Sequence, residues 1–117
     1  MATPSLVKAP LPRGIVAVVI ELDANGNIVV EPDPFWVRKS ADQEVKWFCS
    51  GGHDHKANKP CFTVDFDTKD KPFDEKHFEH HRAHSGCATV EGDKNKKYKY
   101  TVKVGDKTLD PTGGVEP

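Results

Sequence analysis

The chain has no long apolar stretch, and this absence limits the classes of protein to which it can belong. The longest uninterrupted apolar run extends from Ile15 to Ile20, which is too short to span a bilayer. The N-terminus has no charged start followed by a long apolar segment, so the sequence as written predicts no signal peptide and a cytoplasmic location. A mature exported domain that gained Met1 after signal removal would look the same, which keeps a periplasmic or secreted location open.

An excess of charge of one sign is also missing. Basic and acidic residues number 17 and 18, which gives a formal net charge of −1 with neutral histidines. Without a basic field, nucleic acid is not an expected partner. The lysines between Lys94 and Lys103 alternate with Tyr98 and Tyr100. This pattern is typical of a strand whose outward lysines protect a sheet edge.

Cysteines and catalytic motifs are scarce. Three cysteines allow at most one internal disulfide and leave one thiol over. The chain has no Cys-x-x-Cys pair, which excludes zinc-finger spacing, and it has no glycine-rich phosphate loop and no nucleophile motif. The sequence therefore predicts a protein that is not an enzyme.

What the sequence does contain is a series of short alternating or β-branched runs separated by turn residues. The continuous run 14–20 is typical of a strand covered on both faces, and Asn25-Gly26 predicts a type I′ hairpin after it. The strands expected are 14–22, 27–31, 35–37, 44–49, 61–66, 88–90, 97–104 and a terminal strand or tail over 108–117. Such a pattern predicts an all-β sandwich or small barrel, with a lead-in at 1–13, one domain over 14–111 and a tail at 112–117.

The order of features over residues 32–111 resembles the cupredoxin-like family. The pieces that carry the resemblance are Pro34-Phe35-Trp36-Val37, Glu44-Val45-Lys46-Trp47, Cys61-Phe62-Thr63-Val64-Asp65-Phe66, Ser85-Gly86, Tyr98-Lys99-Tyr100-Thr101-Val102 and Leu109-Asp110-Pro111. The resemblance implies a Greek-key β-sandwich. Blue-copper members of that family take a cysteine, a histidine and usually a methionine from a late loop, but residues 100–107 contain none of these and the only methionine is Met1. The resemblance therefore implies the fold without its usual copper centre.

Metal-ligating residues are concentrated in one part of the chain, because all six histidines and all three cysteines lie between Cys49 and Cys87. Four of them, His77, His80, His81 and His84, have the spacing i, i+3, i+4 and i+7. Within the insert 67–86, a short helix over about 74–84 would place these four on one face, where i, i+4 pairs chelate a divalent ion. The alternatives are an irregular insert that is merely an exposed polar stretch, or a pH-responsive surface.

Two further features accompany this histidine face. His53 and His55 form a second candidate pair of metal ligands, and the alternative is that they belong to an ordinary polar loop. Rings bound to a metal need an acceptor for their second nitrogen, and Asp74, Glu75 and Glu79 are near enough in the sequence to serve.

The cysteines admit several arrangements. A disulfide between Cys61 and Cys87 would pin the histidine-rich insert and leave Cys49 as a small core residue. Free thiols and a mixed cysteine–histidine metal site are the alternatives.

The leading functional hypothesis is a metal-binding module for copper or zinc, without an organic cofactor, that stores, delivers or senses the ion. Its candidate ligands are His77, His80, His81, His84, His53 and His55. The alternative is a metal-free structural or interaction module, in which strand 14–20 forms a homodimer or docks a protein partner.

Overall fold

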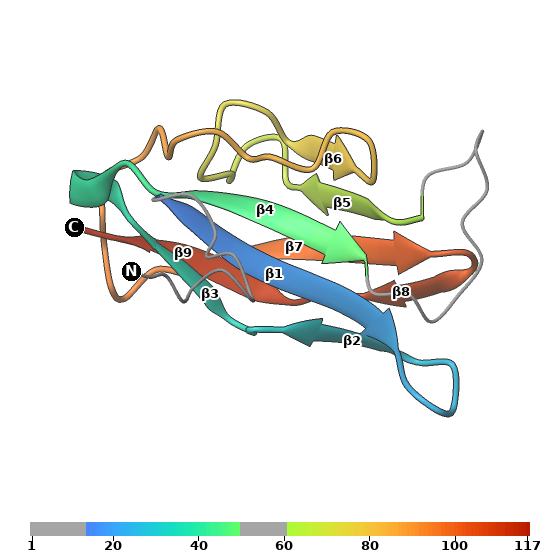
Figure 1. The fold of residues 1–117 in the computed structure, drawn as a ribbon. Coiled ribbons are helices and arrows are strands. Elements are labelled where there is room, and N and C mark those ends of the chain that lie inside the picture. The colour runs from blue at the N-terminus through green and yellow to red at the C-terminus, as the bar shows by residue number, and fades with distance from the viewer. Residues whose placement is uncertain (1–13, 50–60) are drawn as a thin grey trace, which may run out of the picture.

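The structure is a computed structural model that describes residues 14–49 and 61–117. It consists of two curled β-sheets packed against each other, as the ribbon shows (Figure 1). The strands are β1 (Ile15–Leu22), β2 (Ile28–Glu31), β3 (Phe35–Arg38), β4 (Glu44–Cys49), β5 (Thr63–Phe66), β6 (His77–Glu79), β7 (Tyr98–Val104), β8 (Lys107–Leu109) and β9 (Thr112–Glu116). Within the described ranges the only helix is a single 3₁₀ turn, Lys39–Ala41, and no helix there is long and apolar enough to cross a membrane.

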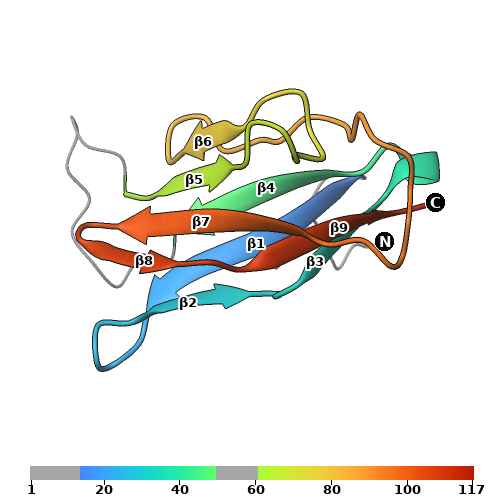
Figure 2. The ribbon, with the colours of Figure 1, turned by 180° about the vertical axis from the view of Figure 1, so that it is seen from behind.

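The two sheets are formed by segments that are distant in the sequence. The first sheet has the order β2-β1-β4, with β1 parallel to β4. The second has the order β3-β9-β7-β5-β6, with β3 parallel to β9 and β8 paired to β7. Seen from behind, β7, β8 and β9 lie in front of β1 and β4 (Figure 2). The chain leaves the first sheet between β2 and β3, at Pro32 and Pro34, because proline cannot donate to a ladder.

The core lies between the sheets and is rich in aromatic rings. Trp47 on β4 is 1% exposed. Its ring stacks on Phe78 at 5.0 Å between centroids and lies 5.9 Å from the ring of Tyr100. The other large side chains buried around them are Phe35, Phe62, Phe66 and Phe73, with Val18, Ile20, Val37, Val45, Val64, Val102 and Val115.

Strands predicted from strict alternation are confirmed. On β7 the buried residues are Tyr98, Tyr100, Val102 and Val104, while the intervening residues are exposed or half-buried. The terminal strand or tail expected over 108–117 is β8 followed by β9, which lies between β3 and β7. The strand predicted over 88–90 is wrong: Ala88 makes only an isolated bridge to Phe73.

The first hairpin is confirmed in its pairing but not in its turn type. β1 pairs antiparallel with β2, yet of the two central residues only Gly26 has a positive φ, 81°. A type I′ turn needs both. Asp23 Oδ1 instead accepts the backbone N–H groups of Asn25 at 2.8 Å and Asn27 at 2.9 Å, which organises a longer loop.

Strand β1 is also not covered on both faces as the sequence suggested. Only Val18 and Ile20 are fully buried, whereas the other apolar residues of the strand are half-buried. β1 is the middle strand of its sheet, since Val19 and Ile20 pair with β2 on one side and β4 on the other. Backbone pairing with a partner's strand is therefore not available at these two residues.

The helix predicted over 74–84 is wrong. His77–Glu79 form β6, which pairs antiparallel with β5. Phe78, the only large apolar side chain of the segment, lies opposite Val64 and is 3% exposed beneath Trp47. This one ring is buried from a strand position, so the spacing of the polar histidines does not decide the conformation.

Candidate functional site

The four clustered histidines lie on the histidine segment, residues 77–87, which runs from β6 to the edge of β4. His77 is on β6 directly opposite Asp65 on β5. Its Nδ1 lies 2.6 Å from Asp65 Oδ1, and its Nε2 lies 3.9 Å from Glu79 Oε2. The side chain is 48% exposed. The strand register thus supplies a carboxylate that sequence proximity did not reveal.

His80 and His81 occupy the tight turn that follows β6. Glu79 and Arg82 close this turn by exchanging backbone hydrogen bonds of 3.1 and 2.9 Å. His81 Nδ1 lies 3.5 Å from Glu79 Oε1. The His80 ring stacks on that of His81 at 4.9 Å, and its Nδ1 accepts the backbone N–H of Cys61 at 3.4 Å. The two neighbouring rings therefore have different roles, with His80 tied to the start of β5.

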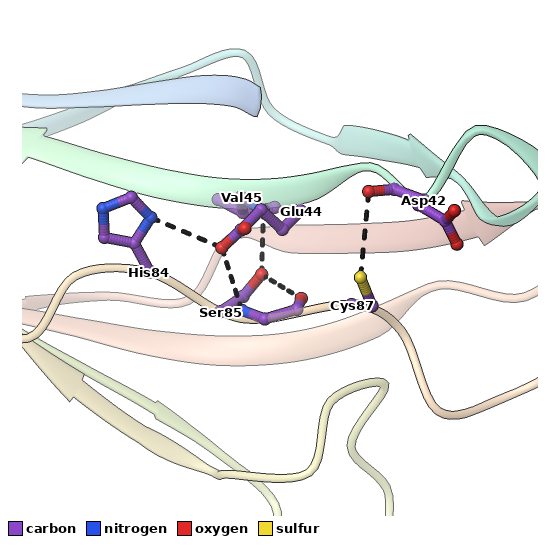
Figure 3. A network of polar contacts seen from close by, with 7 residues as sticks. Asp42, Glu44, Val45, His84, Ser85 and Cys87 are labelled. Atoms are coloured by element: carbon purple, nitrogen blue, oxygen red, sulfur yellow. Dashed lines mark hydrogen bonds and ion pairs between the residues drawn. The ribbon is translucent and has the colours of Figure 1, made fainter. Parts of the chain in front are cut away.

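His84 lies beside β4, where it forms a bridge with Lys46. Its Nδ1 is 3.3 Å from Glu44 Oε1, and the other ring nitrogen points away from that contact (Figure 3). The same oxygen of Glu44 accepts the backbone N–H of Gly86 at 3.2 Å. One carboxylate therefore orients the imidazole and also holds the backbone that follows it.

Ser85 fixes this part of the chain against β4. Its backbone N–H donates to Val45 O at 2.8 Å, and its hydroxyl accepts the N–H of Val45 at 2.8 Å while donating to Gly86 O. Ser85 is the one polar side chain classed as buried in the described part of the chain. Trp47 adds a backbone hydrogen bond to Ala83 O of 3.1 Å. Residues 83–85 thus cover the edge of β4 and place His84 near β6.

Three of the predicted ligands line a single cavity of about 270 Å³. Its wall consists of Glu75, His77, Phe78, His81, Arg82, Ala83 and His84. His80 is not part of this wall. Within residues 14–49 and 61–117, no three histidine, cysteine or acidic side chains are arranged as they stand to hold one ion. The predicted residues His53 and His55 lie outside the described residues.

The carboxylates that orient these rings were only partly predicted. Of the three acids expected to serve, Glu79 does so, whereas Asp74 and Glu75 form no ion pair with a histidine among the described residues. Asp65 and Glu44 were missed because they precede the histidine segment by 12 or more positions. Only the strand pairing of β5 with β6, and the bridge from β4, brings them into place.

The cysteines follow a different pairing from the one expected. A disulfide joins Cys49, at the end of β4, to Cys61, just before β5. The proposed Cys61–Cys87 bond is therefore wrong, as is an unpaired Cys49 in the core. Cys87 is exposed, and its thiol lies 3.8 Å from Asp42 O. Chain geometry explains the outcome: β4 and β5 are consecutive strands in opposite sheets, so a bond between their adjoining ends needs no rearrangement.

Comparison with other proteins adds no relative to this picture. No family profile matches the chain, and searches of curated proteins and of solved structures give no match. A function can therefore be inferred only from the geometry of the described residues.

Proposed function

We propose that the chain is a non-enzymatic metal-binding module that holds a copper or zinc ion with His77, His81 and His84, for storage, delivery or sensing. The observation that carries the proposal is shared by all three rings. Each directs Nδ1 toward a carboxylate, Asp65, Glu79 or Glu44 respectively, and all three rings line one cavity.

A carboxylate on one imidazole nitrogen fixes the tautomer and makes the other nitrogen a better ligand. In His81 and His84, Nε2 is the nitrogen left for an ion, whereas His77 Nε2 lies 3.9 Å from Glu79 Oε2 and would have to exchange that contact for the ion. The side chains of His77, His81 and His84 are 48%, 54% and 55% exposed, so rotation of the rings toward a common point meets little packing resistance. Copper(II) should bind more tightly than zinc, as the general affinity order of nitrogen ligands predicts.

The cupredoxin-like, Greek-key assignment belongs to the same proposal. Its support is that four of the pieces carrying the resemblance form the strands β3, β4, β5 and β7. The late turn at Gly105 and Asp106 joins β7 to β8 and contains no metal-ligating sulfur or imidazole. Metal binding on this scaffold would therefore use the histidine segment in place of the late loop.

The test is calorimetric titration of metal-free protein with zinc and copper at neutral pH. We expect a dissociation constant tighter than about 100 μM, with a loss of affinity of about tenfold or more in His77→Ala, His81→Ala and His84→Ala. His80→Gln is the matched control, because it removes a histidine outside the cavity. Affinity should fall below about pH 6 as imidazoles protonate. Weaker wild-type binding, or equal losses in the control, would dismiss the proposal.

The alternative, a metal-free interaction module, has less support. Such a module would dock a partner on the outward face of the first sheet, which includes Phe48. Lys46 Nζ already lies 4.9 Å from the centre of that ring. Val29 is the one large apolar side chain classed as exposed among the described residues, at 37%. Analytical ultracentrifugation tests this alternative, because a strict monomer at micromolar concentrations without a co-purifying partner would count against it.

A further inference from the structure

Strand β4 ends the first sheet, whose strand order is β2-β1-β4. The side of β4 that faces away from β1 is covered by residues 83–86, which we call the edge guard. The backbone N–H of Trp47 donates to Ala83 O at 3.1 Å, and that of Ser85 donates to Val45 O at 2.8 Å. The backbone groups of Val45 and Trp47 on this side are the ones that a further neighbouring strand would use.

The edge guard contacts β4 over a short length and is not itself a strand. It forms an isolated bridge between His84 and Lys46. At Val45 the hydroxyl of Ser85 takes the place of a strand's backbone carbonyl and accepts the N–H at 2.8 Å (Figure 3). Gly86 then has a φ of 75°, a left-handed conformation in which an extended strand does not continue. The edge of β4 is therefore closed by a few hydrogen bonds and not by a further strand.

The edge beneath the guard is complementary to itself. Because Val45 and Trp47 both direct backbone groups to this side, an antiparallel second copy of β4 can pair Trp47 with Trp47. The same register places Lys46 of each copy opposite Phe48 of the other. Within one chain Lys46 Nζ lies 4.9 Å from the centre of the Phe48 ring, which is an attractive contact. A symmetric pair of strands would form the equivalent contact twice.

We propose that the edge guard hides a self-association surface, and that β4 pairs antiparallel with β4 of a second copy when the guard is weakened. A long strand edge with unpaired backbone groups is a template for such pairing, and proteins cover these edges to remain monomeric. This proposal does not depend on metal binding, so it is tested on metal-free protein in the presence of a chelator.

Two substitutions weaken the guard in different ways. Ser85→Pro removes both the hydroxyl and the N–H that contact Val45. Gly86→Val leaves these groups in place but disfavours the φ of 75°, and a Cβ at this position meets nothing within 4 Å. Gly105→Val is the matched control, because Gly105 has a φ of 63° and equally open surroundings in the turn between β7 and β8.

Analytical ultracentrifugation should find the wild type and Gly105→Val monomeric at about 100 μM, whereas both guard variants form dimers with a dissociation constant below about 100 μM. Hydrogen exchange at the Val45 and Trp47 amides should be fast in the dilute guard variants and slow in their dimers, because strand pairing protects these amides. Adding Lys46→Glu should weaken the dimer about tenfold or more, since it removes both contacts with the Phe48 rings.

Guard variants that stay monomeric up to about 1 mM would overturn the proposal. Dimers whose Val45 and Trp47 amides stay unprotected would overturn it as well, since the copies would then meet elsewhere. So would a wild-type protein that dimerises as tightly as the guard variants. Near-ultraviolet circular dichroism checks that each variant is folded. A variant that does not fold is replaced by Ser85→Ala, which removes the hydroxyl alone, and the same outcomes then decide.

Discussion

Strand β7 and the histidine segment both have a regular spacing in the sequence, but only β7 adopts the structure that its spacing predicts. In β7 the repeated residues are Tyr98, Tyr100, Val102 and Val104, and all four are buried. In the histidine segment the repeated residues are imidazoles, and His77, His81 and His84 are exposed. A regular spacing in the sequence decides the conformation when burial of the spaced side chains stabilises the folded state. Exposed polar side chains contribute little to that stability.

The two regions also differ in the interactions that hold them in place. The residues around Trp47 are packed aromatic rings from both sheets. Residues 83–87 are held by hydrogen bonds from Ser85, Glu44 and the backbone of β4. This contrast predicts that the core determines stability, whereas the histidine segment tolerates substitution and can carry a site.

The largest effect should come from Trp47→Ala. Removal of this ring from among Phe35, Phe66, Phe78 and Tyr100 should lower the free energy of unfolding by about 3–5 kcal/mol. His81→Ala, in the exposed turn, should change it by less than about 0.5 kcal/mol in metal-free protein. Urea denaturation measures both, and comparable losses would remove the contrast between core and segment.

The next effect concerns the cysteines. Replacing both Cys49 and Cys61 by alanine should lower the free energy of unfolding by about 3 kcal/mol, because the loop between them is no longer closed in the unfolded chain. Cys87→Ser should leave stability nearly unchanged, since this thiol is exposed. Thiol titration of the unfolded, non-reduced protein should find one free cysteine, and three would contradict the pairing.

A smaller effect is expected where the histidine segment meets β4. Ser85→Ala removes the hydroxyl that accepts the N–H of Val45, so a buried donor loses its partner. The cost should be about 1–3 kcal/mol, with faster hydrogen exchange at Val45 and Ser85. Ser40→Ala is the control, because its hydroxyl contact to Pro117 is exposed. Unchanged exchange in Ser85→Ala would mean that the segment is held by other contacts.

The smallest effect should be confined to alkaline pH. Burial raises the pKa of the Tyr100 phenol above its ordinary value, and the neighbouring Trp47 opposes that rise. The folded state keeps the proton that the unfolded state loses above about pH 10. This group's contribution is therefore present below pH 10 and declines above it, by about 1.4 kcal/mol per pH unit. Tyr100→Phe should flatten the alkaline stability curve, and parallel curves would show that other groups dominate there.

Particular residues show how far the sequence alone could reach. The strand positions of Val45 and Trp47, and of Val64 and Phe66, follow directly from alternation and are confirmed by burial. The disulfide could not be deduced, since three cysteines allow three pairings and spacing does not rank them. For the site, the sequence named the histidines. It did not identify Asp65 and Glu44 as the acids behind His77 and His84, because those contacts arise from strand pairing.

The sequence by itself determined the strands that have alternating apolar residues, because such residues have only one arrangement that buries them on a common face. It also confined the metal-ligating side chains to residues 49–87. Only the tertiary structure decided which of them meet. Phe78 anchors β6 under Trp47, Ser85 fixes the returning chain on β4, and His77, His81 and His84 are thereby brought to one cavity. The physical reason is that a few buried side chains position the exposed ones, and those buried contacts join residues far apart in the chain.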